Sequence, residues 1–248
     1  MRHAALALAL ALAAAAAAAQ ERLESRELLG QIGNRQAVLH LHANPRADGS
    51  QRLTGEYLVL PTLQRRYLEG ERSKQLGVMF LREGLTPILY GREPSATLQG
   101  TWSGGVFRGT RYGPGGQQRE RFEFRESFPA LDGYSAAVRC DAAEDRYSAT
   151  LAYTVEAGRL KAGSLEWRSS VAPSGHGCAI AAQDPVAQAD FPGGLRFVAG
   201  KRCGVTLRDL GDYLRVTAED CAEFCGSQGY FEPMLVDRRG GCQLLRPR

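Results

Sequence analysis

Two histidines stand at alternate positions of one apolar segment, in the order His40-Leu41-His42. Alternate side chains of a β-strand point to the same face and lie about 7 Å apart along it. Two imidazoles at this spacing are compatible with two ligands of one metal ion, with His176 or Glu56 as a third. Half-exposed strand histidines explain the pattern more simply. The sequence therefore predicts no metal and no cofactor, and keeps His40 and His42 as weak metal candidates.

A histidine stands two positions before a cysteine in Ser174-Gly175-His176-Gly177-Cys178. Catalysis by such a pair would require a free Cys178 thiol and a third, orienting group. The even number of cysteines argues for a disulfide instead. The chain also lacks the Gly-x-Ser-x-Gly elbow of serine hydrolases, and nothing singles out a pair of acids for glycosidase chemistry. These features predict that the protein is not an enzyme.

The glycine-rich segment that begins at Thr101 combines aromatic side chains with arginines. A hairpin of this composition beside a mobile glycine loop would present a flat aromatic and cationic surface to a glycan or to a protein cleft. Trp102 and Phe107 are expected to face a core. The predicted binding residues are Arg108, Arg111 and Tyr112. Of these, we expect Arg111 and Tyr112 to carry the contact.

The N-terminus has the residue pattern of an export signal. The basic start, Met1-Arg2-His3, is followed by an uncharged run of Ala and Leu from Ala4 to Ala19. The run ends in alanines that satisfy the small-x-small rule for cleavage, and at 16 residues it is shorter than the roughly 20 that a membrane-spanning helix needs. A signal peptide over 1–19 is therefore predicted. The Ala, Leu and Arg composition is typical of bacteria, so we expect a soluble periplasmic or secreted protein without a membrane span.

All six cysteines lie in the second half of the chain. In an oxidising compartment an even number of cysteines indicates disulfides. The spacing Cys221-x-x-x-Cys225 matches neither paired zinc ligands nor a thioredoxin-like redox centre. The six disulfide cysteines are Cys140, Cys178, Cys203, Cys221, Cys225 and Cys242. We expect one bridge between Cys140 and Cys178, because no other cysteine lies nearby in sequence. The pairing of the last four cysteines stays open.

The positive charge is dispersed. The chain has 31 basic and 27 acidic residues, for a formal net charge of +4, and only three of the basic residues are lysines. Guanidinium groups pair well with carboxylates and phosphates. Acids are interleaved with them, however, as in Arg119-Glu120-Arg121. Because no basic stripe forms, the sequence argues against nucleic-acid binding.

Apolar and polar residues alternate along most of the chain, with turn residues about every ten positions. The segments 36–42, 53–60 and 105–111 show this pattern. Short strands separated by glycine-containing turns are typical of antiparallel barrels and sandwiches. No long segment has the 3.6-residue period of a helix, although 217–226 is compatible with a helical turn. The sequence therefore predicts an all-β protein.

Two domains are expected. Residues 20–28 are polar and are expected to form a linker, with one short helical turn as the alternative. A proline and a turn follow Phe128. We therefore assign 29–128 to an N-terminal β-meander domain and 129–248 to a C-terminal β-domain that contains every cysteine. The predicted architecture is two small antiparallel β-domains, barrel or sandwich, of which the C-terminal one is stapled by disulfides.

Short glycine motifs recur in the N-terminal half. They are Gly30-Gln31-Ile32-Gly33, Leu53-Thr54-Gly55-Glu56-Tyr57, Leu68-Glu69-Gly70, Leu98-Gln99-Gly100-Thr101-Trp102 and Phe107-Arg108-Gly109. This half resembles a pattern common in uncharacterised bacterial periplasmic β-proteins. The tail from Cys203 to Gly226 is similar to small β-modules of lysozyme-inhibitor-like periplasmic proteins. The resemblance implies a fold class and a compartment. Such glycines mark turns and close crossings of strands.

Together these features predict a non-enzymatic periplasmic or secreted protein that binds a partner in the cell envelope. The expected partner is an envelope protein or a glycan, and no nucleic acid. One alternative is an inhibitor of lysozyme, in which a rigid loop plugs the glycan cleft. Another is an enzyme acting on cell-wall glycans or peptides. Such an enzyme would have a concave pocket containing acids with perturbed pKa values.

Overall fold

The computed structural model describes residues 25–74, 77–87, 93–225 and 229–245, and the predicted signal peptide lies outside these ranges. The chain divides into two compact units, 1–126 and 127–248, close to the expected boundary. Apart from strands, the described residues form three short 3-10 turns: η1 (Leu60–Thr62), η2 (Pro114–Gly116) and η3 (Ala222–Phe224). The all-β prediction is confirmed. None of the described segments forms a helix long and apolar enough to cross a membrane.

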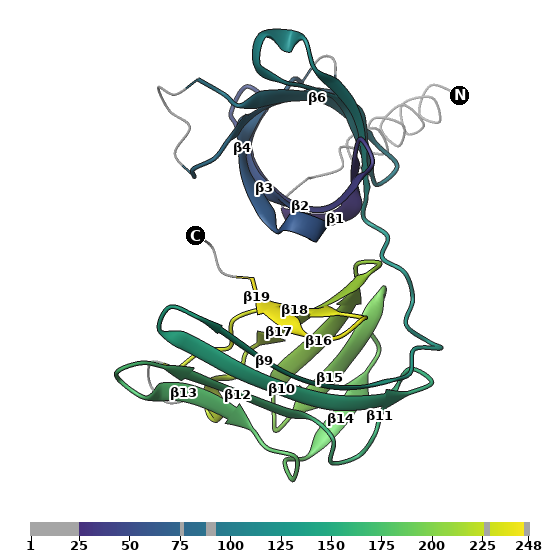
Figure 1. The fold of residues 1–248 in the computed structure, drawn as a ribbon. Coiled ribbons are helices and arrows are strands. Elements are labelled where there is room, and N and C mark those ends of the chain that lie inside the picture. Colours follow the sequence, from purple (N-terminus) through teal and green to yellow (C-terminus); the bar gives the residue numbers. More distant parts are fainter. Residues whose placement is uncertain (1–24, 75–76, 88–92, 226–228, 246–248) are drawn as a thin grey trace, which may run out of the picture. The chain divides into compact units, whose positions relative to one another are not determined.

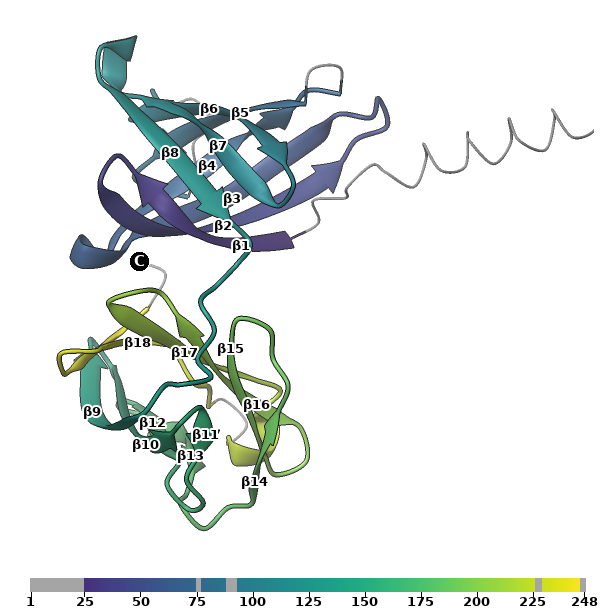
Figure 2. The ribbon, with the colours of Figure 1, turned by 90° about the vertical axis from the view of Figure 1, so that its right-hand side faces the viewer.

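The first unit is a closed antiparallel barrel of eight strands (Figure 1, Figure 2). Its strands are β1 (Ser25–Ile32), β2 (Arg35–Pro45), β3 (Gln51–Val59), β4 (Gln64–Arg72), β5 (Val78–Gly84), β6 (Ala96–Ser103), β7 (Val106–Tyr112) and β8 (Arg119–Arg125). Each strand pairs with the next, and β1 closes the ring against β8.

The expected linker over 20–28 is too long. Residues 25–28 belong to β1, where Ser25 pairs with His42 and Leu28 pairs with Leu39. Although this segment is mostly polar, Leu28 is fully buried in the barrel core. A strand needs only its alternate residues to be apolar when its other face is exposed. The polar residues that resemble a linker are therefore the outer face of a strand.

Alternate residues of every barrel strand fill the interior. Along β6, for example, buried positions alternate with exposed or half-buried ones. The expectation that Trp102 and Phe107 face a core is confirmed, since Phe107 is fully buried and Trp102 nearly so. The Phe107 and Phe122 rings lie 4.7 Å apart between centroids, and Phe122 also contacts Phe124. These aromatic side chains form the core at one end of the barrel.

Glycines stand on the inner face of five strands, at points where the neighbouring backbone comes very close. A Cβ atom added to Gly70 would lie 1.8 Å from the Phe80 carbonyl oxygen, which is far inside van der Waals contact. A Cβ added to Gly100 would also meet the Phe107 and Phe122 rings. The five inward glycines are Gly30, Gly55, Gly70, Gly100 and Gly109. Their missing side chains let the sheet curve tightly enough to close.

Replacing Gly70 with alanine is expected to lower the free energy of unfolding of the barrel by about 1–3 kcal/mol, because the added methyl group must displace backbone. Each unit holds one tryptophan, so Trp102 fluorescence in a Trp167→Phe background reports urea unfolding of the barrel. Gly133→Ala is the control from the second unit, where a Cβ meets nothing within 4 Å, and it should leave the unfolding transition of the barrel unchanged. Equal stability of the two variants would contradict this account.

The second unit consists of two antiparallel sheets that share one core. The first sheet contains β9 (Ala136–Glu144), β10 (Tyr147–Glu156), β11 (Arg159–Leu160), β12 (Glu166–Val171) and β13 (His176–Ile180). The second contains β14 (Val186–Ala189), β15 (Gly194–Ala199), β16 (Cys203–Asp209), β17 (Tyr213–Glu219), β18 (Met234–Asp237) and β19 (Cys242–Leu244). The largest buried side chains between them include Trp167, Tyr153 and Phe197.

Three disulfides hold this unit together, and their pairing differs from the expected one. The bridges are Cys140–Cys242, Cys178–Cys225 and Cys203–Cys221. The prediction of Cys140–Cys178 is wrong. Cys140 lies on β9 and Cys178 on β13, and β10 and β12 separate these strands. Three strand spacings amount to about 14 Å, well beyond the reach of a disulfide.

The helical turn expected over 217–226 is also wrong for most of its length. β17 continues to Glu219, and only Ala222–Phe224 forms a single 3-10 turn. The Cys203–Cys221 bridge fixes the chain directly before this turn. A covalent tie to β16 and the ladder of β17 therefore override the helical propensity of this alanine- and glutamate-containing segment.

Candidate functional site

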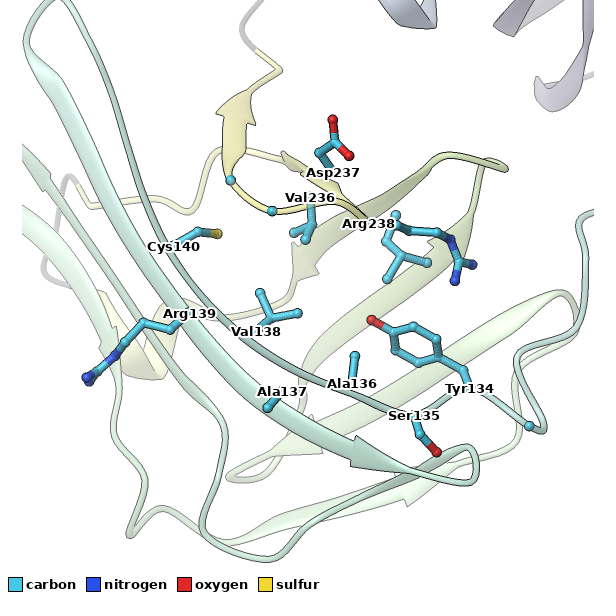
Figure 3. A pocket seen from close by; sticks show the side chains of 14 residues that line it. Tyr134, Ser135, Ala136, Ala137, Val138, Arg139, Cys140, Val236, Asp237 and Arg238 are labelled. Carbon is cyan, nitrogen blue, oxygen red and sulfur yellow. The ribbon is translucent and has the colours of Figure 1, made fainter.

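A groove opens in the second unit between β9 and the hairpin of β18 and β19 (Figure 3). Its volume is about 460 Å³. Val138 of β9 and Val236 of β18 point toward one another across it (Figure 3), and Leu214 of β17 contributes to the same lining. Val236 and Leu214 are almost fully buried, whereas Val138 is half exposed. The groove thus has an apolar floor that solvent reaches from the β9 side.

Fixed contacts define both ends of the groove. At one end the Arg238 guanidinium lies 5.3 Å from the centroid of the Tyr134 ring. Arg238 also donates from Nε to the Gly211 carbonyl and pairs through Nη2 with Asp209 at 2.8 Å. At the other end the Cys140–Cys242 disulfide joins β9 directly to β19. The hairpin is therefore held at a set separation from β9, and the groove is already formed.

The backbone of β9 supplies the polar part of the groove. β9 pairs with β10 along one edge, over the whole length from Ala136 to Glu144. Within the described ranges its other edge has no ladder partner, and residues 136–140 line the groove. The Val138 side chain enters the groove, whereas Arg139 points away from it (Figure 3). An open strand edge carries N–H and C=O groups that can pair with another extended chain.

The groove does not assemble an acid–base pair from its lining residues. Asp237 is the one carboxylate in that lining, as far as the chain is described. Hydrogen bonds from the Arg239 side chain and backbone lower the pKa of Asp237, so this group stays ionised. Glycosidic cleavage uses two carboxyl groups, one of them protonated. The described lining of this groove therefore supplies one ionised carboxylate and not the pair that this reaction uses.

A cluster of polar side chains lies inside one end of the barrel, and it contains Arg111. The Arg111 guanidinium binds Glu83 through two hydrogen bonds, of 2.7 Å to Oε2 and 2.9 Å to Oε1. Its third bond, of 2.8 Å, reaches Glu120, which also accepts from Arg35. The Tyr57 hydroxyl donates to Glu83 at 2.6 Å. Arg111 is therefore engaged inside the barrel and is not placed for the surface contact expected of it.

The charge of Glu83 is set by its partners. Its side chain is fully buried. Burial alone raises the pKa of a carboxyl, but the hydrogen bonds from Arg111, Tyr57 and Ser95 and the Arg111 charge outweigh burial, so the pKa of Glu83 lies below its usual value. Burial and the Glu83 charge raise the pKa of Tyr57. The cluster is thus an ionised carboxylate fully surrounded by donors.

The other two predicted binding residues lie on the outside of the barrel. Arg108 and Tyr112 share a face of β7 because they are an even number of residues apart, whereas Phe107 and Arg111 share the opposite face. Arg108 is exposed and Tyr112 is half exposed. Arg119 of β8 lies over the Tyr112 ring at 5.7 Å from its centroid. The structure therefore keeps Arg108 and Tyr112 together and separates Arg111 from them.

The histidine pair lies on one outer face, as the spacing of β2 predicts. His40 pairs in register with Glu27 and with Glu56, and its Nε2 lies 3.3 Å from Glu27 Oε1. His42 pairs with Ser25 and Thr54. Among the residues that the structure describes, no three of His, Cys, Asp and Glu are grouped closely enough to hold a metal ion.

Cys178 forms a disulfide with Cys225, so the oxidised protein has no cysteine nucleophile beside His176.

The sequence did not predict the groove. Its walls come from 133–140 and from 236–241, which are about 100 residues apart in the chain. The pattern of small residues in Ala136-Ala137-Val138 was a possible signal, since small side chains leave a strand edge open.

No protein-family model, curated protein or solved structure matches this chain.

Replacing Arg111 with methionine is expected to lower the free energy of unfolding of the barrel by about 3–5 kcal/mol, because the buried Glu83 carboxylate loses its two short charged hydrogen bonds and keeps only Arg66, whose Nε lies 3.6 Å from Oε1. Adding Glu83→Gln to that variant should recover part of the loss, since it removes the stranded charge. Urea unfolding followed through Trp102 measures both. A double variant less stable than Arg111→Met would overturn this reading of the cluster.

The stability of the barrel should also depend on pH through Glu83. Because the folded-state pKa of Glu83 is depressed below its usual value of 4.5, its stabilising contribution is fully present above about pH 4.5. The contribution is lost as the pH falls through the lower folded-state pKa. The free energy of unfolding, measured between pH 2 and pH 6, should therefore fall less steeply in Glu83→Gln than in the native protein. Identical slopes would argue against this role.

Proposed function

We propose that this protein is a non-enzymatic binding protein of the bacterial periplasm or the extracellular space, which captures an extended peptide segment of an envelope protein. The observation that carries the proposal is the open edge of β9, which lines a preformed groove. Strand addition to such an edge obtains affinity from main-chain hydrogen bonds. The groove beside it supplies places for alternate side chains of the added strand.

The dimensions of the groove fit a short segment. Residues 136–140 span about 17 Å as a strand, so a partner of roughly five residues would pair along them. Every second side chain of that partner would point to the floor formed by Val138, Leu214 and Val236. A segment with alternating apolar residues matches this floor. Polar residues at the intervening positions would face solvent beside Arg139.

The disulfides support both the compartment and the binding role. Three bridges are typical of proteins in an oxidising environment, which agrees with the predicted signal peptide. The Cys140–Cys242 bridge also fixes the hairpin relative to β9 before any partner arrives. A site that is ordered in advance loses less conformational entropy on binding. The bridge therefore favours affinity as well as stability.

Peptides selected from a random decapeptide library on the oxidised protein are expected to bind this groove. On binding, outward amides of residues 136–140 should become protected from hydrogen exchange, because they form a new ladder. Val138→Asp should weaken the selected peptide by about ten-fold or more, since it places a charge on the apolar floor. Calorimetry measures the affinity, and NMR measures the exchange.

Arg139→Gln is the matched control, because the neighbouring side chain points away from the groove (Figure 3). It should leave the affinity unchanged. The proposal fails if selected peptides bind without protecting residues 136–140, or if both variants weaken binding equally.

A further inference from the structure

A second surface of the molecule, on the outside of the barrel, carries several arginine side chains. Along β7 and β8, Arg108 pairs in register with Glu123, Thr110 with Arg121, and Tyr112 with Arg119. All six side chains share the outer face, because their strand neighbours Phe107, Arg111, Phe122 and Phe124 are directed inward. The three arginines therefore lie within about 14 Å of one another.

The acids nearby leave these arginines in excess. Glu123 forms an ion pair with Arg125, and Glu120 is directed inward, where it binds Arg111 and Arg35. In the described part of the chain, Arg108 and Arg121 have no ion-pair partner, and Arg119 contacts the Tyr112 ring. All three arginines are exposed. The face thus carries a local positive charge that attracts an anionic partner.

Neutral hydrogen-bonding groups extend this face across the next strand. Gln99 of β6 pairs in register with Thr110, and Thr101 pairs with Arg108. Both residues are exposed. Hydroxyl and amide groups beside guanidinium groups can bond to the hydroxyls and the carboxylates of one sugar chain. The Tyr112 ring lies beneath the Arg119 guanidinium and holds that charge on this face.

From this chemistry we infer that the outer face of β6, β7 and β8 binds an acidic polysaccharide, with Arg108, Arg119 and Arg121 pairing with its carboxylates. Guanidinium groups pair with carboxylates in a bidentate manner. This site lies in the barrel unit and does not depend on the peptide groove of the proposed function. An anionic membrane is the less suitable partner, because membrane-binding surfaces place large apolar side chains among their cations. The centre of this face holds threonine and glutamine instead.

Alginate, a polyuronate, is the probe, and dextran is its neutral counterpart. The protein without residues 1–19 should bind alginate, should not bind dextran, and should release alginate as salt screens the charges. Arg108→Gln/Arg119→Gln/Arg121→Gln should weaken alginate binding by about ten-fold or more. Calorimetry at two salt concentrations measures these affinities.

The matched control is Arg146→Gln/Arg159→Gln/Arg202→Gln, which removes the same charge from exposed positions of the second unit. It should retain the native affinity for alginate. An equal loss in both triple variants would show attraction by net charge alone and would overturn the site. Binding to phosphatidylglycerol vesicles that is tighter than binding to alginate, or no binding to alginate at all, would also overturn it.

Discussion

The barrel depends on the close approach of backbones at its inward glycines. At Gly70, Gly55 and Gly109 a neighbouring carbonyl oxygen occupies the place that a side chain would take. Eight short strands can close into a ring only where the sheet bends sharply, and a missing Cβ permits that bend. The space opened beside Gly100 is filled by the Phe107 and Phe122 rings. The short glycine motifs of the N-terminal half therefore contain the positions at which this barrel closes.

Closure of the barrel also places charged side chains in its interior. Arg111 follows Phe107 and Gly109 on the inner face of β7, so closing the barrel carries its guanidinium inside. It can remain there because Glu83, Tyr57 and Glu120 arrive on three other strands at the same end. Removing one partner of such a cluster costs more than the cluster contributes, which makes its members mutually dependent. The outer face is left with Arg108, Arg119 and Arg121.

The second unit obtains its stability differently. Its two sheets do not close on themselves, so strand edges remain, and disulfides connect them. The Cys140–Cys242 bridge joins the edge strand β9 to β19 while leaving residues 136–139 beside an open groove. Most proteins protect such an edge with proline, lysine or a covering segment. An edge held open by a covalent bond is suited to receiving a partner strand, which is the basis of the proposed function.

The sequence by itself determined the all-β class, the restriction of disulfides to the second half, and the inward position of Trp102 and Phe107. These follow from local alternation and from composition. The same alternation places Arg111 on the opposite face of its strand from Arg108 and Tyr112. It does not show that the interior accepts a charge, because Glu83 lies 28 residues away from Arg111. Only the tertiary structure decided that cluster, the cysteine pairing and the groove, since each depends on which strands become neighbours across long stretches of chain.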